Sequence, residues 1–406
     1  MVAIGFTTHL DLPGPRVNPV VFPFDRLFNR VVPMRDWIKT VFSSRSMGQD
    51  HFPNEAHADG LLPPSEDTFA AINELSRVVK NNPDAVEIYL ALGNLYRSQG
   101  EIERAVHIRQ NLILRPGLHQ EFKARAYYEL GRDYKRGGFV DRAFDALRQA
   151  RKIAGNNPAI TMELAKLSAE SEEYVQAANY YQELGNSVAE AHYLVRQAQK
   201  ECRDDPKRAQ AGKWLDRALK VSPGCMEAWL EKLQRAWGGQ EKAKPAKILE
   251  LAMALVPKQM RFMLLEGLLS TALNNDRSGN SSPSASDLDG ALAVLSGYPQ
   301  DMLLQYYGGL LLLDQGHVQD AQAWFERCLI LEPNFWLARL EILNLAQKRH
   351  DLPKTLAVQL EFFISRAREV KRFSCRQCGL KRESIFFICP RCGSWHSITF
   401  RRNLNE

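Results

Sequence analysis

The chain has 406 residues, of which 45% are hydrophobic and 25% are charged, as in an ordinary soluble and folded protein. This length allows two or three ordinary domains or one extended repeat array. The net charge of +6 is modest, which argues against a dedicated nucleic-acid binder and leaves a mild preference for anionic partners. We find neither a secretory signal nor a run of about 18 apolar residues, so we expect a cytoplasmic protein without a transmembrane helix.

The first 65 residues contain closely spaced prolines, so we expect residues 1–65 to be mostly irregular. One stretch, 33–43, has apolar residues at helical spacing after a proline and predicts a short amphipathic helix. Its apolar face is formed by Met34, Trp37, Ile38, Val41 and Phe42. Two interpretations stay open: the face contacts a membrane surface, or the helix packs on the rest of the protein.

Residues 66–370 carry a repeat whose period is visible in the prolines. Pro223 and Pro257 are 34 residues apart, and so are Pro299 and Pro333. This is the tetratricopeptide period, in which each unit is a pair of helices. We therefore predict an all-α tetratricopeptide-repeat solenoid of about seven or eight helix pairs. The polar, breaker-rich residues 274–287 are predicted to form a loop inside one unit.

The repeat units also share small and turn-forming residues. Gly93 with Ala105, and Gly131 with Ala143, are expected to let the two helices of a pair approach closely. Gly309 with Ala321 is the corresponding pair in a late unit. A further glycine between the two helices turns the chain, and the proline ends the second helix. The turn glycines are Gly100, Gly138 and Gly316.

Residues 371–406 contain two CxxC pairs, CRQCG at 375–379 and CPRCG at 389–393. Two such turns can wrap one metal ion and bring four thiolates to tetrahedral corners. We predict a rubredoxin-like or zinc-ribbon knuckle that binds one iron or zinc ion, with residues 385–388 as one of its strands. The predicted ligands are Cys375, Cys378, Cys389 and Cys392. The other three cysteines are scattered, which favours a reducing compartment over a disulfide framework.

The run LALGNLYRSQGEIERAVHIRQNL (90–112), the run ELGRDYKRGGFVDRA (129–143) and the terminal CxxC pairs together resemble the lipopolysaccharide assembly protein B family. The resemblance implies a non-enzymatic adaptor on the cytoplasmic face of the bacterial inner membrane. It further implies partners: a membrane-bound AAA+ protease and the deacetylase that commits precursors to lipid A. In that family the repeats and the knuckle pack on each other, and the cysteines hold iron or zinc.

The family normally begins with a transmembrane helix, which this sequence lacks. We therefore expect that the Trp37 helix substitutes as a peripheral anchor, that the protein docks on a partner, or that its role has drifted.

The first helix of each repeat pair is expected to line a groove for partners. Asn94 and Arg97 from one unit, and Arg132 and Lys135 from the next, are candidate partner-binding residues because amide and cationic groups suit a peptide or an acidic segment. The competing interpretation is that they are ordinary solvated residues.

We find no catalytic motif and expect no enzyme activity. His107 and His192 are expected to be packing or surface residues rather than metal ligands, and His396 lies near the knuckle, where four cysteines already complete a tetrahedral shell. Two other functions stay open: electron transfer through an iron knuckle, and nucleic-acid binding by a zinc ribbon with a basic tail.

Overall fold

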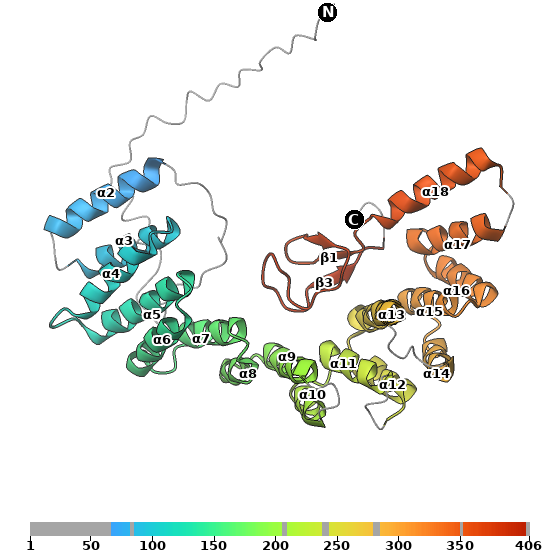
Figure 1. Cartoon of the computed structure of the whole chain (residues 1–406), viewed down its shortest axis with the longest axis horizontal. Helices are drawn as coiled ribbons and strands as arrows, with labels where there is room; N and C mark the ends of the chain where they lie inside the picture. The colour runs from blue at the N-terminus through green and yellow to red at the C-terminus, as the bar shows by residue number, and fades with distance from the viewer. Residues whose placement is uncertain are drawn as a thin grey trace, which may run out of the picture. The chain divides into compact units, whose positions relative to one another are not determined.

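The computed structural model describes residues 66–81, 85–204, 209–237, 243–278, 285–349 and 352–402 (Figure 1). Residues 1–65, including the predicted membrane-contacting residues Trp37, Ile38, Val41 and Phe42, lie outside the described residues. Among the described residues, no helix combines the length and apolar character needed to cross a bilayer.

Helices follow one another from residue 66 to residue 368, and neighbours in sequence pack together, as α3 does on α4 and α5 on α6. After α2, the described helices form eight successive pairs, which confirms the predicted repeat fold. The first helices are α2 (Glu66–Asn81), α3 (Val86–Ser98), α4 (Ile102–Ile113), α5 (Gln120–Arg136), α6 (Val140–Ala154), α7 (Pro158–Glu170), α8 (Tyr174–Glu183), α9 (Ser187–Asp204) and α10 (Ala209–Val221). They are followed by α11 (Met226–Trp237), α12 (Pro245–Leu255), the 3-10 helix η1 (Lys258–Met260), α13 (Arg261–Ser278), α14 (Ala285–Ser296), α15 (Met302–Asp314), α16 (Val318–Leu331), α17 (Trp336–Arg349) and α18 (Lys354–Arg368).

The predicted turn and stop residues lie where the helices change direction. Gly100, Gly138 and Gly316 have φ angles of +79°, +77° and +80°, a left-handed conformation that glycine adopts without steric cost. Pro223 and Pro257 each follow the last residue of the second helix of a pair by two positions. Because proline lacks an amide hydrogen and crowds the preceding turn, it prevents the helix from continuing.

The helix-facing glycines are required by close packing. A Cβ atom added at Gly93, Gly131 or Gly309 would lie within 2.7 Å of a side chain on the second helix of the same pair. The obstructing side chains are Arg109, Leu147 and Phe325, each 16 residues after its glycine. These three residues are therefore structurally equivalent, and in the α3–α4 pair the position is occupied by arginine instead of an apolar residue.

The predicted loop at 274–287 is wrong at both of its ends. Helix α13 runs to Ser278 and α14 begins at Ala285, so helix occupies both ends of the predicted loop, and residues 279–284 lie outside the described residues. Asn and Asp lower helix propensity by only about 0.7 kcal/mol each, which an already nucleated helix tolerates.

The knuckle contains a three-stranded antiparallel sheet in the order β2-β1-β3. Its strands are β1 (Phe373–Cys375), β2 (Lys381–Arg382) and β3 (Ile398–Phe400). Phe373 pairs with Phe400 across the sheet, and Cys375 pairs with Ile398. The predicted strand at 385–388 is wrong: Ile388 makes only an isolated bridge with Trp395. Phe386 is buried in the hydrophobic cluster that the knuckle shares with the repeats, so this apolar run serves packing and not strand pairing.

One continuous apolar cluster extends from α11 through α17 into the knuckle. At its centre the Phe262 ring of α13 lies 5.8 Å from Phe373 and 5.5 Å from Phe400, measured between ring centroids. Phe335, just before α17, also contacts Phe400, at 6.2 Å. The knuckle is thus built on the later repeats by a shared core.

Candidate metal centre and its contacts with the repeats

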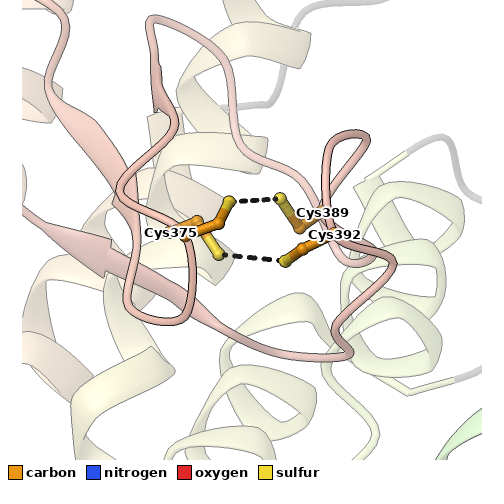
Figure 2. A group of neighbouring side chains, drawn as sticks. Cys375, Cys389 and Cys392 are labelled. Carbon is orange, nitrogen blue, oxygen red and sulfur yellow. Dashed lines mark hydrogen bonds between the residues drawn. The ribbon is translucent and has the colours of Figure 1, made fainter. Parts of the chain in front are cut away.

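The four predicted ligands come together at the end of the knuckle. The sulfur atoms of Cys375, Cys378, Cys389 and Cys392 all lie within 4.8 Å of one another. The Sγ atoms of Cys375 and Cys392 are 3.7 Å apart, and those of Cys378 and Cys389 are 3.6 Å apart (Figure 2). A tetrahedral ion with metal–sulfur bonds of about 2.3 Å separates its ligands by about 3.8 Å. A disulfide would need about 2.05 Å. The arrangement therefore fits one metal ion.

Each CxxC turn is shaped by the glycine that follows it. Gly379 and Gly393 have φ angles of +70° and +66°, and their amides donate to the carbonyls of Cys375 and Cys389 at 2.8 Å. The two turns are therefore copies of one local structure. In the first turn, the backbone amides of Gln377 and Cys378 also help to lower the pKa of Cys375.

The surroundings of Cys375 and Cys392 favour the thiolate form. Burial raises the pKa of Cys375, but hydrogen bonds from the Ser397 hydroxyl and from two backbone amides outweigh it and lower the pKa to about 6. A hydrogen bond with the Ser394 hydroxyl is the main cause of the lowered pKa of Cys392. An amide contact from Leu380 lowers the pKa of Cys378, but burial and the neighbouring sulfurs raise it to about 12. The cluster thus accumulates negative charge that a cation would neutralise. A bound ion would take the place of the retained proton.

The base of the knuckle is tied to α13 by an ion pair. The Arg372 guanidinium donates to both carboxylate oxygens of Glu266, at 2.7 and 3.1 Å. The Tyr307 hydroxyl of α15 donates to the same carboxylate at 2.8 Å. The Arg372 and Glu266 side chains are 28% and 14% exposed, so the pair is largely shielded from solvent. Three separate segments are thereby linked through one carboxylate.

A second carboxylate joins the other end of the knuckle to the repeats. Glu227 of α11 is 4% exposed, and its Oε1 atom lies 3.3 Å from His192 Nδ1 of α9 and 3.2 Å from His396 Nε2 of the knuckle. Burial would raise the pKa of Glu227, but hydrogen bonds from His192 and His396 outweigh burial and hold the pKa well below its usual range. As expected, neither histidine belongs to the cysteine cluster. Their partnership with Glu227 has no signal in the sequence.

Trp395 of the knuckle inserts among aromatic residues of the repeats. Its ring centroid lies 6.2 Å from Tyr181, 6.1 Å from Tyr193 and 5.1 Å from His192, in edge-to-face geometry. Such contacts add to the burial energy of the rings. The knuckle is therefore held at both ends, by α13 near Arg372 and by α8–α9 near Trp395.

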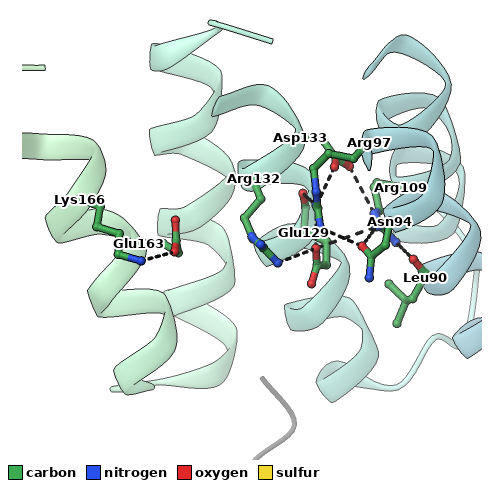
Figure 3. Close-up of polar contacts among 9 residues, drawn as sticks. All are labelled: Leu90, Asn94, Arg97, Arg109, Glu129, Arg132, Asp133, Glu163 and Lys166. Carbon is green, nitrogen blue, oxygen red and sulfur yellow. Dashed lines mark hydrogen bonds and ion pairs between the residues drawn. The ribbon is translucent and has the colours of Figure 1, made fainter. Parts of the chain in front are cut away.

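Three of the four candidate partner-binding residues, Asn94, Arg97 and Arg132, lie in a network of polar contacts between the first repeats (Figure 3). Arg97 Nη1 contacts Glu129 and Asp133 at 2.8 Å each, and Arg97 Nη2 donates to Asn94 Oδ1 at 3.1 Å. Arg132 pairs with Glu129 at 3.5 Å. Lys135 pairs with Glu170 at 2.8 Å. Each candidate thus has a partner inside the chain, and its binding of another protein stays a prediction.

Sequence reasoning missed the buried members of this network. Arg109 is fully buried and donates to the Leu90 carbonyl at 2.8 Å and to Asp133 at 3.3 Å. Burial raises the pKa of Asp133, whereas at Glu129 the surrounding arginines outweigh burial and lower the pKa. The available signal was a charged residue at the position where the later units carry Leu147 and Phe325.

Comparison with known proteins bears on the same regions. A family model described as Tetratricopeptide repeat matches residues 66–114. Lipopolysaccharide assembly protein B of Escherichia coli strain K12 is 25% identical over 344 residues, which are 82% of this chain and 86% of that protein. The chain is similar to lipopolysaccharide assembly protein B over most of its length. The protein of that name from Haemophilus influenzae is 25% identical over 331 residues, covering 77% of this chain and 78% of the relative.

Solved structures that resemble the chain are repeat proteins. A tetratricopeptide repeat protein from Parabacteroides merdae covers 68% of this chain and 98% of its own, with 16% identity and a TM-score of 0.30. The similarity to lipopolysaccharide assembly protein B that the sequence motifs predicted is confirmed by the relatives from Escherichia coli and Haemophilus influenzae.

Proposed function

We propose that this protein is a non-enzymatic adaptor that limits lipopolysaccharide synthesis by presenting a lipid A pathway deacetylase to a membrane-bound AAA+ protease. It would act in the cytoplasm, at the inner face of the inner membrane. The similarity to lipopolysaccharide assembly protein B over 82% of the chain is the observation that carries this proposal. The repeat architecture supports it, because stacked helix pairs present extended surfaces suited to holding proteins.

The role of the knuckle in this proposal is structural. Four cysteines would hold one iron or zinc ion, which supplies folding energy to a lobe too small to build a sufficient core of its own. Arg372, Trp395 and His396 then attach the lobe to three different parts of the repeat array. A partner would thus meet one rigid surface made of both.

The alternative of nucleic-acid binding has less support from the contacts of the knuckle. Phe386 is buried in the shared core, and Trp395 is surrounded by Tyr181, Tyr193 and His192. Base stacking requires an accessible ring face, which the buried Phe386 does not offer and which the partly buried Trp395, with three aromatic neighbours, offers less readily. Electron transfer remains testable by voltammetry, since it requires a reversible redox couple in the purified protein.

The adaptor proposal is tested in a lipopolysaccharide-producing strain from which the gene has been deleted. We expect the level of the lipid A deacetylase to rise on deletion, and to fall again when the wild-type gene is restored. A gene encoding the Cys375→Ser variant should fail to lower the deacetylase level, whereas one encoding Cys202→Ser, which alters a cysteine outside the cluster, should lower it. Unchanged deacetylase levels on deletion would refute the proposal.

A further inference from the structure

A shallow cavity of about 400 Å³, largely open to solvent, lies where the knuckle meets the repeats. Its walls come from α7, α8 and α9 on one side and from the segment just before Cys389 on the other. This volume lies within the range of about 300–1,000 Å³ of known ligand pockets. The principal lining residues are Lys166, Tyr174, Tyr193, Arg196, Phe387 and Ile388.

Much of the cavity wall is aromatic or aliphatic. The Tyr174 and Tyr193 rings stack at a centroid distance of 6.3 Å and an interplanar angle of 18°. Phe387 and Ile388 face this side from the knuckle and are only half-buried. An apolar side chain resting on these residues would remove part of their apolar surface from water.

The cavity also offers a cation that lacks a carboxylate partner. The Arg196 guanidinium is 5.4 Å from the centre of the Tyr174 ring, and it donates to the neutral Gln199 and Tyr174 side chains at 3.4 Å each. No carboxylate of the described part of the chain lies within ion-pair distance of Arg196. The lining carboxylate, Glu170, is already bound by Lys135. The free charge of the cavity is therefore positive.

We propose that this cavity binds an acidic peptide segment carrying one aromatic or large aliphatic side chain. A carboxylate of the segment pairs with Arg196, and the apolar side chain enters between Tyr193 and Phe387. An arginine held against a tyrosine ring is oriented for bidentate binding, and a carboxylate matches its geometry. The proposal rests on the adaptor function, since it names the kind of protein segment that the adaptor would hold.

The composition of the cavity links peptide binding to the metal site. Ile388 directly precedes Cys389, whose amide donates to the Ser394 carbonyl at 3.0 Å within the second CxxC turn. Loss of the ion would release this turn and with it the wall formed by Phe387 and Ile388. Removal of the metal should therefore reduce the affinity for the peptide as strongly as loss of the Phe387 ring does.

The binding test uses the purified full chain and a fluorescein-labelled peptide, Asp-Glu-Phe-Glu-Asp, followed by fluorescence anisotropy. We expect saturable binding that Arg196→Glu weakens at least roughly tenfold, equivalent to one charge-assisted contact. Phe387→Ala, with its metal content verified, should weaken it similarly. The matched control is Arg104→Glu, because Arg104 lies 5.7 Å above the Tyr96 ring but outside the cavity.

Three results would overturn the proposal: no saturation at roughly millimolar peptide, equal affinity for Lys-Lys-Phe-Lys-Lys, or equal weakening by the two arginine variants. Binding of inorganic phosphate or of phosphatidylglycerol vesicles in place of the peptide would also overturn it.

A test in cells separates this proposal from the adaptor function. In the deletion strain, wild type and Arg104→Glu should both restore control of the deacetylase level, and Arg196→Glu should not. If Arg196→Glu restores control fully, the cavity proposal fails and the adaptor function stands. If wild type itself has no effect on the deacetylase, the adaptor function fails and the anisotropy result alone decides whether the cavity binds acidic peptides.

Discussion

Arg372 holds both carboxylate oxygens of Glu266, although the two residues are 106 positions apart in the chain. The pair fastens the start of the knuckle to α13, and Tyr307 completes the hydrogen bonding of the carboxylate. Because both side chains are mostly shielded, removing one partner would leave the other poorly solvated.

This arrangement predicts that Arg372→Ala destabilises the attachment of the knuckle. We expect a loss of about 2 kcal/mol, below the range for a fully buried pair because some solvent reaches Arg372. Denaturant unfolding, together with proteolysis near residue 370, measures the effect. The control is Arg366→Ala, which removes an exposed pair with Glu369 and should cost no more than about 0.5 kcal/mol. An equal loss of unfolding free energy in the two variants would contradict the conclusion that Arg372 attaches the knuckle to α13.

The Glu227 carboxylate predicts a specific dependence of stability on pH. Its pKa is lowered in the folded protein from the usual carboxyl value of 4.5, so its contribution is complete above pH 4.5. As the pH falls below 4.5, the unfolded chain takes up a proton before the folded chain does, and the stabilisation is progressively lost.

We therefore expect wild type to be more stable than Glu227→Gln at pH 7, with a difference that shrinks below pH 4.5. The quantity to measure is the difference in denaturation midpoint between the two proteins at each pH, in which protonation of the cysteines largely cancels. A difference that stays constant down to pH 3 would show that Glu227 does not titrate in this way.

The cysteine cluster predicts about one metal ion per chain, since four thiolates complete a tetrahedral shell. Elemental analysis of the purified protein should find iron or zinc in that ratio. Cys389→Ser should reduce the metal content severely and expose the knuckle to protease, because metal binding and folding are coupled in small lobes. Cys202→Ser alters a cysteine outside the cluster and should retain the ion. Equal metal content in both variants would exclude the cluster as the site.

Arg109 predicts a large stability effect far from the knuckle. Arg109→Met would leave Glu129 and Asp133, both almost fully buried, without their closest buried cation. We expect a loss of about 3 kcal/mol or more in the stability of the first repeats, as for other buried ion pairs that lose one member. Hydrogen exchange of α3–α5 would localise the effect. Arg104→Met, which removes an exposed pair with Glu101, should leave exchange nearly unchanged.

Much of the fold was accessible from local pattern. The proline spacing, the turn glycines and the helix-facing glycines predicted the repeat, and the structure places all of them as expected. The two predictions of local structure that failed, at 274–287 and 385–388, rested on composition. Polar residues continued a helix in the first stretch, and apolar residues packed against another part of the chain in the second.

The candidate site, like the fold, was predicted from the sequence only in part. The spacing of the CxxC pairs predicted that four cysteines would meet, because the ligands of such a site come from two short turns. The binding of an ion, the partner-contacting residues and the domain boundaries remain predictions. The repeat pattern places Arg109 at the position of Leu147 and Phe325, but it does not indicate the partners that allow its burial, Glu129 and Asp133 from the next helix pair.

By itself, the sequence determined the repeat of helix pairs, the glycines at which they turn, and which cysteines lie together, since each depends on neighbours within one repeat or one turn. Only the tertiary structure decided that Arg372 meets Glu266, and that His396 meets Glu227 across 169 residues. Such contacts form where the knuckle, which is not a repeat, packs on the repeats. The repeat period of the sequence does not indicate where on the array the knuckle packs.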